Sequence, residues 1–331
     1  MATIRDVAKE AGLSTGTISK ALSTPERVSK KNLEKIQIAI KKLKYKPNML
    51  AQKFRAKSSK TIVVLVPDIA NQFFASVISG IELVAQNRGY SVLLGDTRDS
   101  AVREREFVRM VETKLADGII NLRPYKKEDA ILPQDDILSV SASSCEGTPS
   151  YSVRIDNVGA AKKAVSHLIA LGHKRIGVIS GLKENPHNID RFNGYKAALA
   201  DANITYDPKL VVAGDFNYWS GLTAAEQFSI MKPRPTAIFS MNDEMAIAAI
   251  RGFKDKGINM PEDMSIIGFD DMEVSRYCIP TLTTISQPAE KIGEKSAELL
   301  LQLIEGKKPE TEEYILPYEF VIRESIAPPK I

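Results

Sequence analysis

From Thr61 onward the chain alternates short, uninterrupted apolar runs with stretches of helical periodicity. The apolar runs span residues 61–66, 90–94, 117–122, 175–179, 236–240 and 265–269. Runs of this length without polar alternation are typical of parallel strands that are buried on both faces and covered by helices. Gly89, Gly172 and Gly257 lie where the intervening helices should end, as expected for left-handed caps. The sequence therefore predicts an α/β body of doubly wound parallel sheets.

These units fall into two groups, one before about residue 156 and one after it, which predicts a body of two lobes. Parallel sheets bind ligands beyond the carboxyl ends of their strands, so we expect a binding site in the cleft between the lobes. Polar and aromatic side chains follow the predicted strands. The candidate ligand contacts are Asp68, Asn71, Phe74, Arg123, Asp156, Arg191, Phe216, Asn242 and Asp270. Carboxylates, amides, a guanidinium and flat apolar rings together suit a small hydroxylated ligand.

Positive charge is concentrated at the N-terminus. The first 60 residues hold 15 Lys and Arg against 4 Asp and Glu, whereas the remaining residues hold 30 against 37. A basic segment of this kind neutralises phosphates and gains affinity for nucleic acid by releasing counterions. The charge distribution therefore indicates a basic head that binds DNA and a mildly acidic body.

The head begins with two helical patterns separated by a short turn. An apolar stripe runs from Ile4 to Ala11, and Gly12 ends it. Ser14 is then placed to cap a second helix. The side chains that remain outward on the second helix are Thr15, Gly16, Thr17, Ser19 and Lys20. This arrangement predicts a helix-turn-helix whose second helix presents its N-terminal end to the major groove.

A third helix is expected to close the core of the head. Ser29 is placed to cap it, and its apolar stripe runs from Leu33 to Leu43 among many lysines. The alternative is a solvated, lysine-rich bundle with no role in nucleic-acid binding. Gly16 argues for DNA binding, because Gly inside a helix costs about 1 kcal/mol relative to Ala and close approach of DNA is a reason to keep it.

Several functional classes are disfavoured by what the sequence lacks. It contains no apolar run long enough to span a membrane and no signal-peptide pattern, which predicts a cytoplasmic protein. Cys145 and Cys278 are isolated and His167, His173 and His187 are scattered, so we expect structural roles for them and no metal or cofactor. An enzyme is the main alternative for an α/β body. It is disfavoured because the Gly-rich phosphate fingerprint, the G-x-S-x-G elbow and the H-E-x-x-H pair are missing.

Motifs in both the head and the body are specific enough to indicate a family. Those of the head are Thr-Ile-Arg-Asp-Val-Ala-Lys-Glu-Ala-Gly-Leu-Ser at 3–14, Thr-Ile-Ser-Lys at 17–20, Val-Ser at 28–29 and Tyr-Lys-Pro-Asn at 45–48. Those of the body are Gly-His at 172–173, Arg-Phe-Asn-Gly at 191–194, Asn-Asp at 242–243, Pro-Glu-Asp-Met-Ser-Ile-Ile-Gly-Phe-Asp at 261–270 and Leu-Thr-Thr-Ile-Ser-Gln-Pro at 282–288. Along essentially the whole chain the sequence resembles the lactose-repressor/galactose-repressor family of bacterial transcription regulators. The resemblance implies a homodimeric repressor whose affinity for double-stranded operator DNA is set by a small effector.

The resemblance also implies roles for residues of the head. The implied base contacts are Thr15, Gly16 and Lys20, and the implied phosphate contacts are Ser14, Thr17, Ser19 and Ser29. Lys20 departs from the family pattern, in which Arg is usual, and a Lys lacks the fixed fork that discriminates guanine. A hinge helix is implied over residues 47–59, with Asn48 and Phe54 as DNA contacts. Phe54 stands where Leu is common and is expected to wedge into the minor groove, its alternative being a packing role under the linker.

For the whole chain the resemblance implies three parts and an α/β fold. Residues 1–46 form the helix-turn-helix head, 47–59 the hinge and 60–331 an effector-binding and dimerisation domain similar to type I periplasmic binding proteins. In that domain the N-lobe covers about 60–156 and 289–316, and the C-lobe about 157–287 and 317–327.

Within the implied effector site, Arg191, Asn242 and Asp270 hold the most recurrent contact positions of the family. More variable positions, for which a strand-end cap or an interlobe hydrogen bond is the alternative role, are Asp68, Phe74, Asp156 and Phe216. The run at 67–74 resembles the cytidine-type nucleoside repressors of the family more than the lactose type, so a sugar or a nucleoside is expected. Arg123 would also suit a sugar acid or sugar phosphate. Both induction and co-repression remain open.

Overall fold

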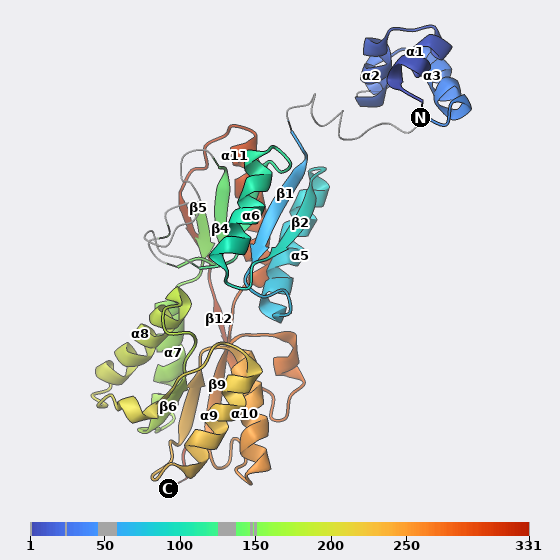
Figure 1. Cartoon of the computed structure of the whole chain (residues 1–331). Helices are drawn as coiled ribbons and strands as arrows, with labels where there is room; N and C mark the ends of the chain where they lie inside the picture. The colour runs from blue at the N-terminus through green and yellow to red at the C-terminus, as the bar shows by residue number, and fades with distance from the viewer. Residues whose placement is uncertain are drawn as a thin grey trace. The chain divides into compact units, whose positions relative to one another are not determined.

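The computed structural model describes residues 2–23, 25–45, 58–124, 137–145, 148 and 151–330. The chain divides into two compact units, Met1–Lys60 and Thr61–Ile331. The described part of the first unit is helical, and the second unit alternates strands and helices (Figure 1). The helices of the first unit are α1 (Ile4–Ala11), α2 (Thr15–Ser23), the 3-10 helix η1 (Pro25–Arg27) and α3 (Lys30–Lys42).

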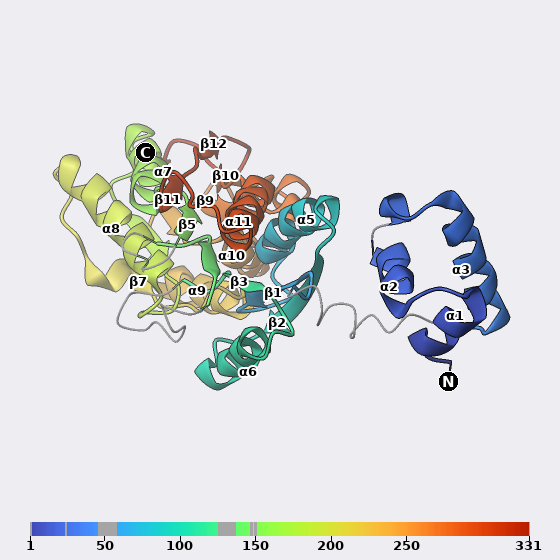
Figure 2. The same cartoon turned by 90° about the horizontal axis from the view of Figure 1, so that it is seen from above.

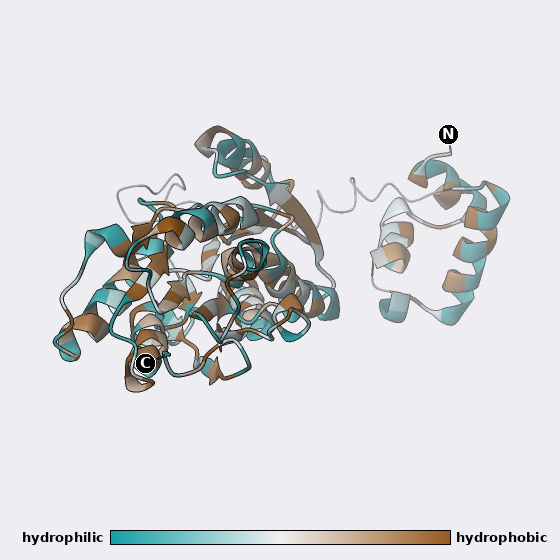
Figure 3. Ribbon diagram, turned by 90° about the horizontal axis from the view of Figure 1, so that it is seen from below, coloured by the Kyte–Doolittle hydropathy of each residue, from teal (hydrophilic) through white to brown (hydrophobic). Residues whose placement is uncertain are grey.

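The helices α1, α2 and α3 of the head pack together through apolar side chains, which recur along each helix as the brown bands of Figure 3. Their shared core is formed by Val7, Ala8, Ala11, Ile18, Ala21, Ile36 and Ala39. At the start of α1, Thr3 and Asp6 form a capping box, in which the Asp6 N–H donates to the Thr3 hydroxyl and the Thr3 N–H donates to the Asp6 carboxylate. Gly12 ends α1 with a left-handed φ of 65°. The predicted start and end of the first helix are therefore confirmed.

The two predicted serine caps differ in outcome. Ser14 caps α2 as predicted, since its Oγ accepts a hydrogen bond from the Thr17 N–H at 3.1 Å. Ser29 occupies the N-cap position of α3 in an extended conformation, but its side chain makes no capping hydrogen bond. The predicted start of α3 is therefore correct and the predicted hydrogen bond is not. Lys30 and Lys31 in the first turn are exposed, so water can satisfy their N–H groups instead.

The second unit is built on two six-stranded sheets. The first has the order β11 (Glu313–Ile315), β5 (Tyr151–Arg154), β4 (Ser139–Ala142), β3 (Gly118–Asn121), β1 (Thr61–Val66) and β2 (Ser91–Asp96). The second has the order β12 (Glu319–Val321), β10 (Thr283–Ser286), β9 (Ser265–Asp270), β8 (Ala237–Ser240), β6 (Ile176–Ile179) and β7 (Val211–Val212). Neighbouring strands are parallel except β10 and β12, which are antiparallel.

Helices cover both faces of each sheet. Those of the second unit are α5 (Gln72–Asn87), α6 (Ala101–Glu112), α7 (Asn157–Ala170), α8 (Pro186–Asp201), α9 (Tyr218–Ile230), α10 (Asp243–Asp255) and α11 (Ala289–Ile304), with 3-10 helices η3 (Pro208–Leu210) and η4 (Glu273–Arg276). Figure 2 shows α6 on the opposite side of the first sheet from α5 and α11. In the second lobe α7 packs against α8, and α9 against α10. The predicted doubly wound α/β architecture is confirmed.

The chain passes between the two sheets at three places, and the lobes are joined there. The first crossing follows β5, the second follows β10 and the third lies between β11 and β12. As a result, the C-terminal part of the sequence contributes a helix and a strand to the first lobe before it returns to the second.

One predicted strand differs from the pattern of burial on both faces. β2 is the edge strand of the first sheet and pairs only with β1. Ser91 and Leu94 on it are exposed, and only Gly95 is buried. The run at 90–94 is apolar enough to resemble a central strand, but an edge strand has only one neighbouring strand to cover it. The remaining predicted runs correspond to β1, β3, β6, β8 and β9, whose residues are almost all buried.

Two glycines allow α5 and α11 to approach each other closely. A Cβ added at Gly80 would lie 2.1 Å from the Glu290 carbonyl oxygen, and one added at Gly293 would lie 2.0 Å from the Val77 carbonyl oxygen. Contacts this short with backbone atoms cannot be relieved by a side-chain rotation. The two helices therefore depend on the absence of side chains at both positions.

We expect Gly80→Ala to lower the free energy of unfolding by about 1–3 kcal/mol, the usual cost of overpacking, although Ala is the better helix former. Ser79→Ala is the matched control, since Ser79 is the neighbour of Gly80 on α5 and is not buried. Urea denaturation of both variants measures the difference. Equal or greater stability of Gly80→Ala would contradict the close packing.

Candidate DNA-binding surface and ligand pocket

The N-terminal end of α2 presents small polar side chains on a rigid base. Ile18 and Ala21 hold the helix in the core of the head. Thr15, Gly16 and Lys20 are exposed on its other side. Small side chains at its N-terminus allow a recognition helix to approach base edges closely, and the longer Lys20 side chain one turn later can reach a base.

Hydroxyl groups gather at the same end of α2. The Oγ atoms of Ser14 and Thr17 lie 2.9 Å apart, and Ser19 is half-buried on the same helix. Such groups, together with the helix-end amides, are typical phosphate contacts. Ser29 lies at the start of α3 and is exposed. The other two predicted DNA contacts, Asn48 and Phe54, lie outside the described residues, as does most of the predicted hinge.

A cavity of about 210 Å³ lies at the carboxyl ends of the strands in the second unit. Seven of the nine predicted ligand contacts line it, namely Asp68, Asn71, Phe74, Arg191, Phe216, Asn242 and Asp270. Residues of both lobes contribute to its wall, and the Asn71 amide donates across the cleft to the Glu244 carboxylate at 3.5 Å. The cavity is therefore an interlobe site, as the strand order predicts.

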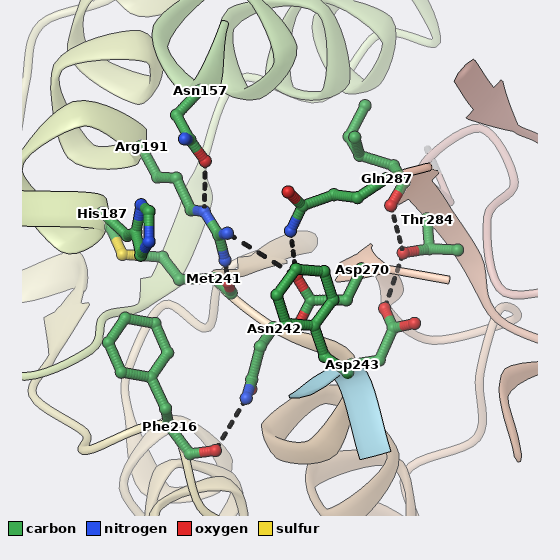
Figure 4. A network of polar contacts seen from close by, with 12 residues as sticks. Asn157, His187, Arg191, Phe216, Met241, Asn242, Asp243, Asp270, Thr284 and Gln287 are labelled. Carbon is green, nitrogen blue, oxygen red and sulfur yellow. Dashed lines mark hydrogen bonds and ion pairs between the residues drawn. The ribbon is translucent and has the colours of Figure 1, made fainter. Parts of the chain in front are cut away.

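Arg191 is the most completely buried charge of this cavity. Its Nε donates to Asn157 Oδ1 at 3.0 Å, an Nη donates to the Met241 carbonyl, and Nη2 lies 3.5 Å from Asp270 Oδ1 (Figure 4). Its guanidinium also lies over the Phe269 ring, 3.7 Å from the centroid. Burial lowers the pKa of Arg191 and the Asp270 carboxylate opposes this shift. The guanidinium is thus fixed by four separate contacts.

Asp270 ends β9 in a conformation that few residues adopt. Its φ is 115° and that of Asp271 is 57°, so two successive non-glycine residues have positive φ. Gln287, at the second crossing between the lobes, donates from Nε2 to Asp270 Oδ1 at 2.7 Å. Burial raises the pKa of Asp270 to about 6, against the opposing effects of Arg191 and Gln287. Strained backbone of this kind is concentrated at functional sites.

Asn242 and Phe216 form the opposite side of the pocket. Asn242 caps α10 through Oδ1, which accepts from the Met245 N–H at 3.0 Å, and its Nδ2 donates to the Phe216 carbonyl at 2.7 Å. The Phe216 ring packs where Gly181 lacks a side chain, since a Cβ there would lie 2.0 Å from Phe216 Cζ. Gly181 therefore makes room for an aromatic wall of the cavity.

His187 is a pocket residue that the sequence did not single out. It lies in the first turn of α8, and both of its ring nitrogens are buried beside the Ser143 backbone. Burial, and then the charge of Arg191, lower the pKa of His187 to about 3, so the ring is neutral. A neutral imidazole offers one donor and one acceptor to a ligand. In contrast, His173 has a structural role, since its ring contacts the Thr236 hydroxyl and the Ala327 carbonyl, both at 2.9 Å.

Two of the nine predicted ligand contacts do not line this cavity. Arg123 lies with Nη1 3.3 Å from the Glu104 carboxylate and Nε 3.4 Å from that of Asp99. Asp156 caps α7, because its Oδ1 accepts from the Gly159 N–H at 2.8 Å. The effector role of Arg123 and Asp156 thus stays a prediction that the geometry of the cavity does not support.

The charge of the described cavity wall is strongly negative. The carboxylates that line it are Asp68, Asp99, Asp215, Glu244 and Asp270. Arg191 is the cation among the lining residues, and it is already paired with Asp270. Burial raises the pKa of Glu244, and its carboxylate neighbours Asp68 and Asp215 raise it further. A bound anion would therefore meet like charges.

The described residues include neither a candidate metal site nor a candidate membrane-spanning helix. They contain no group of three or more His, Cys, Asp and Glu side chains placed to hold a metal ion. None of their helices is both long and apolar enough to cross a membrane.

Both units of the chain are similar to known proteins. Residues 3–48 match the model of bacterial regulatory proteins of the lacI family, and residues 165–326 match that of a periplasmic binding protein-like domain. The HTH-type transcriptional repressor CytR of Escherichia coli (strain K12) is 37% identical over 327 residues, which cover 98% of this chain and 96% of the relative. The HTH-type transcriptional repressor PurR of Photobacterium profundum is 35% identical over 330 residues, 98% of this chain and 99% of the relative.

Among solved structures, the Lac repressor dimer bound to operator and the anti-inducer ONPF has a TM-score of 0.86 and is 28% identical, over 98% of this chain and 99% of that chain. The similarity thus extends from the head through both lobes, and the relatives are transcriptional repressors. The predicted DNA-binding repressor and its fold are confirmed at this level. The chain belongs to the lacI family of bacterial regulatory proteins.

Proposed function

We propose that this chain is a cytoplasmic, non-enzymatic repressor that binds operator DNA as a homodimer and is controlled by a neutral effector in the interlobe cavity. The cavity carries the proposal, because seven of the predicted contacts line it, among them the buried Arg191–Asp270 pair. The exposed Thr15, Gly16 and Lys20 on α2 support the DNA partner. The Lac repressor neighbour, solved as a dimer on its operator, supports the same assembly.

The charge of the cavity favours a neutral sugar or nucleoside over a sugar acid or sugar phosphate. Five carboxylates line its described wall, and the charge of Arg191 is neutralised by Asp270. Arg123, which alone suggested an anionic effector, is paired with Glu104 and Asp99. Carboxylates accept hydrogen bonds from vicinal hydroxyls, and Phe74 and Phe216 offer flat surfaces for a ring. At about 210 Å³ the cavity lies below the ~300–1,000 Å³ of most ligand sites, which suits a monosaccharide or a nucleoside.

An exposed apolar surface on the second lobe supports a homodimer. Tyr277 and Ile279 follow η4 and are 72% and 81% exposed, and Val274 within η4 is also exposed. Exposed apolar side chains that lie together on a surface are typical of sites where another protein binds. We assign them to the contact between two copies of this chain.

Lys20→Ala tests the proposed base contact. We expect it to weaken binding to the selected operator by about 1–3 kcal/mol and to relax preference at one base pair. Lys31→Ala on α3 is the control, because an exposed lysine that meets only phosphate should weaken specific and random DNA equally. Fluorescence anisotropy with operator and scrambled duplexes measures both. Equal losses for Lys20→Ala on the two duplexes would show that it is a phosphate contact.

Asp270→Asn tests the effector site. Asn keeps the shape and the acceptor for Gln287 but loses the charge, so binding should weaken at least ten-fold, which is about 1.4 kcal/mol. Asp255→Asn at the exposed end of α10 is the control. We expect a thermal-shift panel on the wild type to favour cytidine, adenosine and ribose over ribose 5-phosphate and gluconate. Stronger stabilisation by the anions, or an unchanged affinity of Asp270→Asn for the best ligand, would overturn the assignment.

Ile279→Asp tests the dimer surface. A charge introduced into a buried contact costs several kcal/mol, so sedimentation velocity should give a monomer. Ile230→Asp is the control, since Ile230 is 74% exposed at the far end of α9. A dimer of unchanged stability in Ile279→Asp would place the interface elsewhere.

A further inference from the structure

Asp243 is a buried carboxylate that the effector site does not use directly. It is fully buried at the first position of α10, next to the pocket residue Asn242. Three donors converge on it. Its Oδ2 accepts from the Met272 N–H at 2.8 Å and from the Ser275 hydroxyl at 2.7 Å, and its Oδ1 accepts from the Thr284 hydroxyl at 2.6 Å.

These three donors come from the segment that follows Asp270 and from the neighbouring strand. Met272 ends the turn in which Asp270 and Asp271 have positive φ, Ser275 lies in η4 and Thr284 lies in β10. One carboxylate therefore links the start of α10 to β10 and to both ends of the segment 272–275. Figure 4 shows Asp243 between Asn242 and Thr284, near Asp270.

The sequence makes room for this carboxylate at one position. Gly268 lies in β9, and a Cβ there would come within 2.1 Å of Asp243 Oδ1. The N-terminus of α10 also favours a negative charge at its first position. Removing a buried carboxylate that accepts three hydrogen bonds costs free energy of folding, because each of the three donors is left buried without an acceptor.

The turn that Asp243 holds is the one that presents Asp270 to the pocket. Residues with positive φ keep that conformation only where surrounding contacts impose it. The Asp270 carboxylate accepts a hydrogen bond from Gln287. The Asp271 carboxylate accepts one from Arg323 Nη2 at 2.6 Å. The Met272 N–H is held by Asp243. If that bond were lost, we expect the turn to relax and Asp270 to move away from Arg191.

We propose that Asp243 is a positioning residue for effector recognition, which holds the 270–272 turn in the conformation that presents Asp270 and connects it to η4. This role rests on the proposed effector site. Because η4 leads directly to Tyr277 and Ile279, the same contacts connect the effector pocket to the proposed dimer surface. Effector bound at Asp270 is then expected to change the dynamics of residues 273–279.

Thr284→Val and Thr284→Ser form the matched pair that tests the proposal. Thr284 is fully buried. Val keeps its shape and loses the hydroxyl, whereas Ser keeps the hydroxyl and loses a methyl group. If the hydrogen bond to Asp243 positions the turn, Val should weaken binding of the best ligand of the cytidine, adenosine and ribose panel at least five-fold, and Ser should restore it. If Thr284 acts only by packing, Thr284→Ser should weaken ligand binding more than Thr284→Val does.

Hydrogen exchange provides a second measurement that needs no ligand. In the full-length protein, amides of residues 270–276 should exchange at least ten-fold faster in Thr284→Val than in the wild type or Thr284→Ser, with the rest of β9 unchanged. Asp243→Asn should give a larger effect if it folds, and Asp255→Asn on the same helix should give none. If none of the panel ligands binds the wild type, the proposed effector class is wrong. The hydrogen-exchange result then tests the positioning role of Asp243 by itself. Equal exchange in Val and Ser variants would overturn the positioning role.

Discussion

The buried pair of Arg191 and Asp270 is the interaction on which the ligand cavity depends. Taking two charges out of water is costly, and their mutual attraction offsets that cost only when their remaining hydrogen-bonding groups are satisfied. Here Asn157, the Met241 carbonyl and Gln287 supply those bonds. Their positions on α7, after β8 and after β10 mean that one ion pair constrains three separate parts of the second lobe.

The same pair also bears on which ligands the proposed effector site would accept. Because Asp270 already neutralises Arg191, the remaining carboxylates set the sign of the potential in the pocket. Specificity depends on penalties against wrong ligands as much as on contacts to the right one. An anion would bring a charge into a site with no unpaired cation along its described wall, whereas a hydroxyl donates to a carboxylate without that penalty. On charge alone, we therefore expect the proposed effector site to disfavour anions.

Much of this arrangement could be predicted from the sequence, and the reasons for success and failure are local. The helices of the head have clear apolar stripes and end signals such as Gly12, and the central strands of the body are long apolar runs. β4 and β5 were not predicted, because each is four residues long and contains polar positions such as Ser141 and Ser152. These short polar strands are buried because neighbouring strands flank them and α11 packs against them.

The ligand site, too, could be predicted from the sequence only in part. Asp68 and Asn71 follow β1 of the first sheet and Asn242 follows β8 of the second, so topology alone places them at strand ends that can face one cleft. Arg123 also follows a strand, but Glu104 on α6 pairs with it, and no sequence spacing reveals that contact. His187 was missed because a lone histidine near a helix start gives no signal until the fold places it beside Arg191. Side-chain pairing across elements is what the sequence does not encode locally.

The position of Asp243 bears on how an effector can act at a distance. A ligand shifts an equilibrium only by the difference in its free energy of binding to two states, commonly about 1–3 kcal/mol in allosteric proteins. A single hydrogen bond to a buried carboxylate is of the same size. One such bond ties the turn that carries Asp270 to Asp243, and two more tie Asp243 to η4 and β10, so we expect the turn to form one defined state. Because two residues with positive φ make this turn costly to hold, we expect the free-energy difference between it and a relaxed turn to be small enough for a ligand to bias. If effector binding changes the packing of residues 273–279, that coupling is reciprocal, and a change in this packing is then expected to change the affinity of the proposed effector site.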